Sequence, residues 1–214
     1  SPFLEFKKEV PQFDLDMSSE RPEKTDLENI RKAIKPNTKA ILIETPSNPL
    51  LDVTDIRGVV KLAKEHNLIT IVDNTFMTPY LQRPLELGVD IVIHSATKFL
   101  SGHHDLLAGV AVTNDEKLAE KIQFAQTAAG ALISPFDSWL LMRSLKTLKL
   151  RVEAAQKNTE KLIEFFQKHD AVDKIYYPTL DTNKGKKIHE SQAIVGLGWV
   201  WKEELDKIGL SDSL

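Results

Sequence analysis

The chain has 214 residues, 42% of them hydrophobic and 28% charged, with a formal net charge of −3. This balance is typical of a globular chain and excludes a disordered or collagen-like one. Because the sequence has no cysteine, it excludes a disulfide scaffold, a thiolate zinc site and a cysteine nucleophile. No apolar run approaches the ~20 residues that a membrane span needs, and the slightly acidic charge gives no general attraction for nucleic acid. We therefore expect a cytoplasmic protein with neither membrane nor nucleic-acid partners.

The first half of the sequence alternates between helical and strand patterns. Residues 1–25 contain three prolines and no sustained hydrophobic period, so we expect an irregular segment there. The elements predicted after it are a helix at 27–34, a strand at 40–44, a helix at 55–66, a strand at 68–73, a short segment at 81–87, and strands at 89–94 and 106–112. These strands are continuous apolar runs, which are typical of strands covered on both faces in a mostly parallel sheet.

The second half is predicted to be mainly helical. Helices are expected at 116–128, 136–149 and 152–168, and strands at 172–177 and 196–201, with a polar stretch at 180–191 between the strands. The fold class is therefore α/β, a mostly parallel sheet sandwiched by helices, followed by the start of a smaller α+β domain. We expect an irregular or incomplete segment at 1–25, a large domain at 26–154 and an incomplete C-terminal domain at 155–214.

Polar residues that could carry chemistry follow three of the predicted strands. They occupy positions 44–49, 73–75 and 94–98. In parallel α/β sheets, ligands bind at the carboxyl ends of the strands, so these segments should meet at one edge. A buried lysine next to hydroxyls, here Lys98, suggests an amine that attacks a carbonyl to form a Schiff base, and the acid at the neighbouring strand end, Asp73, could hold a protonated ring nitrogen.

These residues also carry a family resemblance. The segment Ser-Ala-Thr-Lys at 95–98, with Val-Asp-Asn-Thr at 72–75 and Glu-Thr-Pro-Ser-Asn-Pro at 44–49, resembles the Cys/Met-metabolism enzymes that use pyridoxal phosphate (PLP). Segments 78–88 and 134–141 extend the likeness, which runs from about Asp26 to about Pro178. The resemblance implies the aspartate-aminotransferase-like fold, PLP fold type I, with residues 26–154 as part of the PLP-binding domain.

The resemblance implies roles for two residues above all. Lys98 would form the Schiff base with the cofactor and later move protons between substrate carbons and cofactor; the alternative is a surface lysine that follows a strand. Asp73 would pair with the pyridinium nitrogen and keep the ring protonated; the alternative is a helix N-cap.

Four further residues are implied as cofactor-binding. Ser95 and Thr97 would hold the phosphate through their hydroxyls, against the alternative of strand-end capping. Asn48 would bond near the 3-oxygen of the ring, or serve only as a turn residue. Thr75 would lie near the ring or have a turn role. No metal ligand set is expected, because the adjacent His103 and His104 diverge in direction and are better explained as loop residues.

The chain also departs from the family pattern. The Ser-Gly-Met-like phosphate turn and the tyrosine that stacks on the ring are not visible in residues 1–25, and the arginine that grips the substrate carboxylate is not matched. We therefore expect a fragment of a longer subunit. The resemblance further implies small-molecule amino-acid substrates and a homo-oligomer, either a dimer or a tetramer.

Three readings of function follow. Segments 103–109 and 139–143 look most like cystathionine γ-synthase, which joins an O-acylated homoserine to cysteine by γ-replacement. The alternative within the family is a cystathionine β- or γ-lyase, which cleaves a carbon–sulfur bond. A rival from another class is a chain that keeps the scaffold but binds no cofactor. A nucleotide-binding domain is disfavoured because no Gly-rich loop follows a strand.

Overall fold

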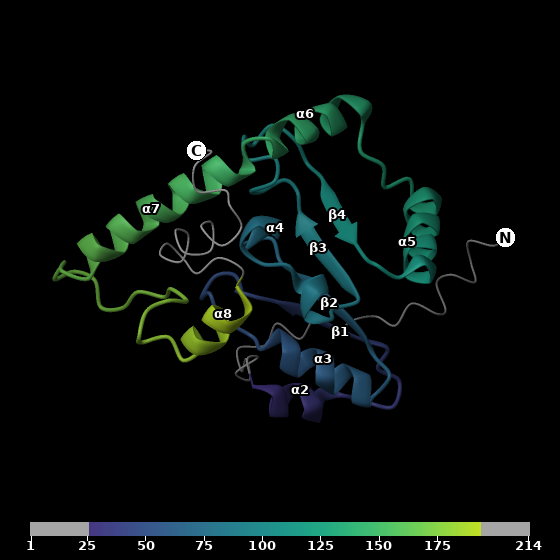
Figure 1. Ribbon diagram of the computed structural model, residues 1–214, viewed down its shortest axis with the longest axis horizontal. Helices are drawn as coiled ribbons and strands as arrows, with labels where there is room; N and C mark the ends of the chain where they lie inside the picture. Colours follow the sequence, from purple (N-terminus) through teal and green to yellow (C-terminus); the bar gives the residue numbers. More distant parts are fainter. Residues whose placement is uncertain (1–25, 194–214) are drawn as a thin grey trace, which may run out of the picture.

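A four-stranded sheet organises the protein, for which a computed structural model describes residues 26–193 (Figure 1). Its strands are β1 (Ala40–Glu44), β2 (Ile69–Asp73), β3 (Ile91–Ser95) and β4 (Gly109–Val112), in the order β1-β2-β3-β4. The first three run parallel, and β4 is antiparallel to β3. The four strands predicted in the first half of the chain and the mostly parallel sheet are therefore confirmed.

Helices α2 (Leu27–Ala33) and α3 (Ile56–Glu65) pack together beside β1 and β2 (Figure 1). Asp55 begins α3 by accepting a hydrogen bond from the backbone N–H of Gly58 at 3.0 Å, a side-chain N-cap. The apolar face of α3 packs on the sheet in two buried clusters. The buried members are Ile41, Ile56, Val59, Val60, Ala63, Val72, Val89 and Val92. Hydrophobic periodicity in the sequence thus locates this layer correctly.

Two short elements, α4 (Thr78–Leu81) and the 3-10 turn η1 (Pro84–Leu87), connect β2 to β3. A third buried cluster joins this connection to the segment after β3 and to the beginning of α7 (Leu148–Phe166). Its members are Met77, Leu81, Ala96, Leu100, Leu148 and Val152. The start of α7 therefore packs against the chain that follows β3, close to the end of the sheet.

The remaining helices are α5 (Glu116–Ala129), α6 (Pro135–Leu145) and α8 (Lys186–Gln192). The sequence predicted helices at 136–149 and 152–168, with a break between them near residue 150. In the structure this break comes earlier, because α6 ends at Leu145 and α7 begins at Leu148. The predicted strand at 172–177 is wrong, because this segment has no regular structure and no strand of the described chain pairs with it. The predicted strand at 196–201 lies outside the described residues.

Coverage of the sheet differs from the expectation. The side chain of Leu42, in the middle of β1, is 59% exposed, and no residue of α5 is buried. Within residues 26–193, α3 covers one face of the parallel strands, and the expected burial of both faces is not met at Leu42. Among the same residues, none of the helices is both long and apolar enough to cross a membrane.

Candidate functional site

The carboxyl ends of the parallel strands meet at one edge, as predicted. Glu44, the last residue of β1, lies opposite Asp73, the last residue of β2, and Asp73 lies opposite Ile93 of β3. The chain leaves β3 at Ser95 and turns at once through Lys98. Parallel pairing therefore brings the carboxylate of β2 and the lysine after β3 to the same edge of the sheet.

Thr75 connects the ends of β2 and β3. Its hydroxyl donates to Asp73 Oδ1 at 2.6 Å, and its backbone N–H donates to the same oxygen at 3.0 Å. The hydroxyl oxygen also accepts from the backbone N–H of Ser95 at 2.8 Å. Both bonds to the carboxylate use Oδ1, so no hydrogen bond from the described part of the chain occupies Oδ2. The Asp73 carboxylate is thus fixed in orientation with one oxygen free for a donor.

Lys98 belongs to a tight turn that continues from β3. Its backbone N–H donates to Ser95 O at 3.1 Å, and its carbonyl accepts from the N–H of Gly102 at 2.8 Å. The backbone of Lys98 is therefore held at both ends. We expected a buried lysine, and that is wrong for this structure: the Lys98 side chain is exposed within residues 26–193.

Thr97 and Ser95 differ in how their hydroxyls are used. The Thr97 hydroxyl accepts from the backbone N–H of Ala108 at 3.0 Å and lies 3.3 Å from the Ala108 carbonyl oxygen, to which it donates. This pairing ties the turn to the segment before β4, as the capping alternative describes. The Ser95 hydroxyl has no hydrogen bond within the described chain, so it is the freer of the two to meet an anion.

Asn48 has no hydrogen bond to the other candidates within the described residues. It lies exposed in a turn at 48–50, beyond β1. The preceding Ser47 closes this loop: its hydroxyl accepts from Asp52 N at 3.2 Å and its N–H donates to Asp52 O at 2.9 Å. The loop starts at the edge, where Thr45 N donates to Asp73 O at 3.3 Å. A contact between Asn48 and a ligand stays a prediction.

A buried amide network behind the edge was missed by sequence reasoning. Asn74 Nδ2 donates to Gln82 Oε1 at 2.6 Å and to Thr45 O at 3.2 Å. Gln82 Nε2 donates to the carbonyl of Gln192, whose own side chain donates to Thr54 O at 2.9 Å. Three buried amides thus connect the residue after Asp73 to α8, more than 100 residues later. Asn74 and Gln82 lie in the 72–75 and 78–88 segments of the family likeness, whereas no sequence signal pointed to Gln192.

His94 is a core histidine, and one of its ring nitrogens lacks a partner within the described residues. The ring is buried, and Nδ1 has no hydrogen bond within the described structure. Burial lowers the pKa of His94 below its usual value, although the negative charge of Asp73 and a backbone hydrogen bond to Asn74 oppose the shift. The imidazole is therefore neutral near pH 7 and adds no positive charge beside Asp73.

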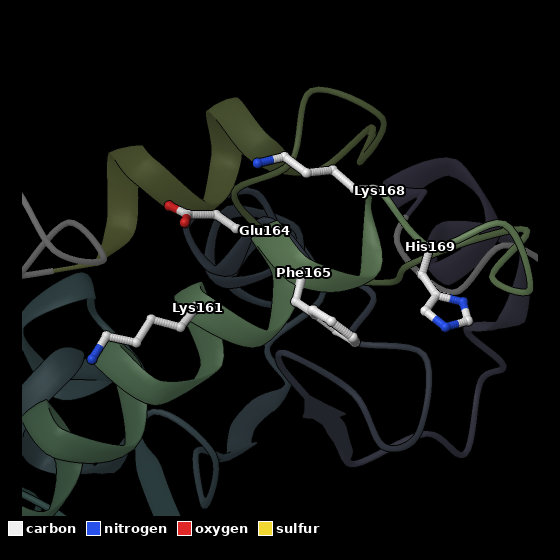
Figure 2. Close-up of a pocket in the computed structure, with 5 residues that line it drawn as sticks. All are labelled: Lys161, Glu164, Phe165, Lys168 and His169. Carbon is white, nitrogen blue, oxygen red and sulfur yellow. The ribbon is translucent and has the colours of Figure 1, made fainter.

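Two surface hollows lie outside this edge. The first is formed by the C-terminal end of α7 and the residues just after it, and it is lined by Lys161, Glu164, Phe165, Lys168 and His169 (Figure 2). It begins ten residues, or about 15 Å of helix, beyond Arg151, which contacts the Lys98 turn. It brings none of the predicted site residues together. The second hollow lies beside the turn and is bordered by His103, Arg143 and Thr147, among others.

The functional groups at the edge suit one kind of ligand. A primary amine (Lys98) can attack a carbonyl carbon, and a carboxylate oxygen (Asp73 Oδ2) can accept from a protonated ring nitrogen. A free hydroxyl (Ser95) can donate to an anionic oxygen. Because these groups extend from neighbouring strands, a small planar molecule with a carbonyl, a ring nitrogen and an acidic group could meet all three.

Comparisons with known proteins agree with this chemistry. The family model of the Cys/Met metabolism PLP-dependent enzymes matches residues 4–204. The chain is 54% identical over 182 residues to cystathionine beta-lyase MetC of Bacillus subtilis, a match that covers 85% of this chain and 46% of the relative. It is 52% identical over 156 residues to cystathionine gamma-synthase of Haemophilus influenzae, covering 73% of this chain and 41% of the relative.

A solved structure extends the comparison to the fold. Cystathionine gamma-lyase from Lactobacillus plantarum, complexed with L-serine, superimposes with a TM-score of 0.78 and 48% sequence identity over 79% of this chain and 45% of that one. The predicted PLP fold type I is thereby confirmed. The chain spans about half the length of the relatives it matches. It belongs to the Cys/Met-metabolism family of enzymes, whose cofactor is PLP.

Proposed function

We propose that the whole protein holds PLP at the strand-end edge and uses it to transform sulfur-containing amino acids. The observation that carries the proposal is the edge itself, where Thr75 fixes Asp73 beside the turn of Lys98. The functional groups at the edge fit the cofactor. The Lys98 amine suits its carbonyl, an oxygen of the Asp73 carboxylate suits its ring nitrogen, and the Ser95 hydroxyl suits its phosphate. When bound, PLP supplies an electron-withdrawing ring that stabilises negative charge at the substrate α-carbon.

Each residue at the edge has its own proposed role. The Asp73 carboxylate accepts a hydrogen bond from the ring nitrogen and favours its protonated form. The Lys98 amine would hold the cofactor through its carbonyl carbon, and it would serve as the base for the proton at the substrate α-carbon. Ser95 orients the phosphate. Thr97 can donate to the phosphate only if its hydroxyl gives up the bond it donates to the Ala108 carbonyl, so we assign it mainly to the shape of the turn.

The substrate proposed is cystathionine, either as the molecule cleaved or as the product formed. Sequence motifs favoured the γ-synthase. The relatives favour cleavage: β-lyases from Bacillus subtilis and Lactococcus lactis match 85% and 88% of this chain, whereas the Haemophilus influenzae γ-synthase matches 73%. We therefore put cystathionine β-lyase first and keep γ-synthase and γ-lyase as the other candidates.

Product analysis of the full-length enzyme distinguishes the candidates. With cystathionine and water, β-cleavage releases homocysteine, pyruvate and ammonia, whereas γ-cleavage releases cysteine, 2-oxobutyrate and ammonia. A synthase instead converts O-acylhomoserine and cysteine to cystathionine and the free acid. Pyruvate as the main 2-oxo acid supports the β-lyase, and cystathionine formation with little cleavage supports the synthase. A full-length protein that stays colourless with added PLP would refute the cofactor proposal itself.

We also propose that the protein assembles as a homo-oligomer in the cytoplasm. The lack of cysteine suits that compartment. Large apolar side chains along α6, namely Phe136, Trp139 and Met142, are 55–68% exposed in the described chain. Apolar side chains that gather on one exposed helix are typical of a protein–protein contact surface. Light scattering on the full-length protein would give the mass, and a monomer at micromolar concentration would contradict this proposal.

A further inference from the structure

Arg151, in the first turn of α7, donates hydrogen bonds to the chain that carries Lys98. Its guanidinium bonds the carbonyl of Phe99 at 2.7 Å and that of Leu100 at 3.3 Å. It also donates to Ser144 O at 3.0 Å and to the Thr147 hydroxyl at 3.1 Å. All four acceptors are neutral oxygens. The side chain therefore joins the two residues after Lys98 to the junction between α6 and α7, rather than pairing with an acid.

The turn is shaped to receive this side chain. Gly102 adopts a left-handed conformation with φ of +69°, and a Cβ at this position would overlap the Arg151 guanidinium. Glycine is thus required twice, for the backbone angle and for the space. The N–H of Gly102 closes the turn by donating to the carbonyl of Lys98 at 2.8 Å, and Ser101 N donates to Ala96 O at 2.9 Å.

Apolar packing alone does not explain the geometry. Leu148 and Val152 of α7 contact the cluster that includes Ala96 and Leu100, and this fixes the distance between helix and turn. Such contacts are non-directional, so they leave the orientation of the peptide planes at Phe99 and Leu100 open. A planar guanidinium holds several N–H donors in a fixed fork and so constrains two successive carbonyls at once, whereas the donors of a lysine rotate freely.

We propose that Arg151 is a positioning residue for Lys98: by holding the carbonyls of Phe99 and Leu100, it sets the backbone from which the Lys98 amine reaches the cofactor and the substrate α-carbon. The inference rests on the proposed function for the role of Lys98. It concerns α7, outside the strand-end motifs from which the site was predicted. A displacement of about 1 Å at a reacting group can lower a rate about 100-fold, so a small rearrangement of this turn is enough to matter.

The test compares three variants of the full-length protein. Arg151→Met keeps the length of the stem and removes every donor, and Arg151→Lys keeps the charge with a single donor group. The matched control is Arg57→Met, because Arg57 also donates to a backbone carbonyl, that of Ser191 at 3.0 Å, but far along the chain from the turn. Hydrogen exchange of the peptide covering 98–102 is measured without added PLP, and kcat and KM are measured with PLP saturating.

We expect faster exchange at Ser101 and Gly102 in Arg151→Met, by about tenfold or more, since opening of the turn exposes both N–H groups. We expect kcat to fall about 100-fold with KM little changed, and Arg151→Lys to lie between Arg151→Met and wild type. If Arg151→Met does not fold, Arg151→Lys decides by the same two measurements. Wild-type exchange and kcat in the deciding variant would overturn the proposal, as would losses no larger than those of Arg57→Met.

Failure of the proposed function gives a different result. Borohydride reduction followed by peptide mapping shows where PLP is attached in the wild-type protein. Attachment at a residue other than Lys98, or none, overturns the role of Lys98 and with it the positioning role of Arg151. Attachment at Lys98, together with unchanged kcat and exchange in the Arg151 variants, overturns only the role of Arg151.

Discussion

Thr75→Val removes the hydroxyl that joins Asp73 to Ser95 while keeping the shape of the side chain. In the native structure this hydroxyl donates to Asp73 Oδ1 at 2.6 Å and accepts from Ser95 N at 2.8 Å. Valine can do neither. The substitution therefore takes one donor from a carboxylate and leaves the N–H of Ser95, the last residue of β3, without its acceptor.

The expected loss of stability follows from these two bonds. A hydrogen bond to a charged group contributes about 1.5–3 kcal/mol, and an orphaned backbone donor costs about 1–3 kcal/mol. Thr75, Asp73 and Ser95 are only half-buried, so water can replace part of both bonds. We therefore expect the lower end of the sum, about 2–3 kcal/mol. With a denaturant dependence of about 2 kcal/mol per molar urea, the midpoint should fall by roughly 1 M.

Urea unfolding of the full-length protein, followed by circular dichroism, measures this shift. Thr75→Ser is the matched control, because serine keeps the hydroxyl and loses only a methyl group; its midpoint should stay within about 0.3 M of wild type. PLP affinity, followed by its visible absorption, should fall in Thr75→Val and be retained in Thr75→Ser. Equal midpoints for the valine and serine variants would refute the reasoning, since the hydroxyl would then not matter.

Three further substitutions test the edge and the network behind it. Lys98→Ala should abolish covalent attachment of PLP and lower kcat by several orders of magnitude. An unchanged visible absorption spectrum with a near-normal rate would show that Lys98 does not hold the cofactor. Asp73→Asn should slow removal of the substrate α-proton more than it weakens PLP binding, because an amide cannot hold the charge of a protonated ring nitrogen. A wild-type rate of α-deuterium exchange would contradict this role and support the alternative, in which Asp73 is only a helix N-cap. Gln192→Leu leaves Ile56 N and Thr54 O without partners and should cost about 2–4 kcal/mol in urea unfolding, with Gln192→Glu as the comparison.

The strand-end edge could be predicted because it depends on local signals. Apolar runs located β1, β2 and β3, and parallel pairing then places their carboxyl ends together whatever the details of packing. Asp73 and Lys98 reach the same edge for that reason alone. The exposure of Lys98 could not be predicted in this way, since burial depends on which distant segments cover the edge.

The C-terminal part shows the opposite case. Val172, Ile175 and Tyr177 give residues 172–177 a strand-like composition, but β-structure needs a partner strand, and the described chain offers none. Helix α8 escaped prediction because the residues it buries are polar. His189 and Gln192 face the interior, so the segment has no apolar period to detect. The partner of Gln192, Gln82, lies 110 residues away.

The pH dependence of stability provides a last test, centred on His189. This residue is 1% exposed, and neither ring nitrogen has a hydrogen-bond partner within the described structure. Burial lowers the pKa of His189 below its usual value of 6.5, with the negative charge of Glu190 opposing the shift. The unfolded chain therefore binds a proton as the pH falls through about 6.5, while the folded chain does not until a lower pH. Folding stability must fall with pH in that window, because the unfolded state holds more protons.

The contribution of His189 can be isolated by substitution. Each buried histidine can change the free energy of unfolding by up to about 1.4 kcal/mol per pH unit, and His94 adds to the same trend. His189→Leu loses no hydrogen bond of the ring and removes one of the two contributions. Between about pH 7 and about pH 5.5, the variant should lose about 1 kcal/mol less stability than wild type. His66→Leu, at an exposed position, controls for removing a histidine as such. Parallel stability curves for wild type and His189→Leu would show that His189 is protonated as readily in the folded protein as in the unfolded chain, which its burial in α8 forbids.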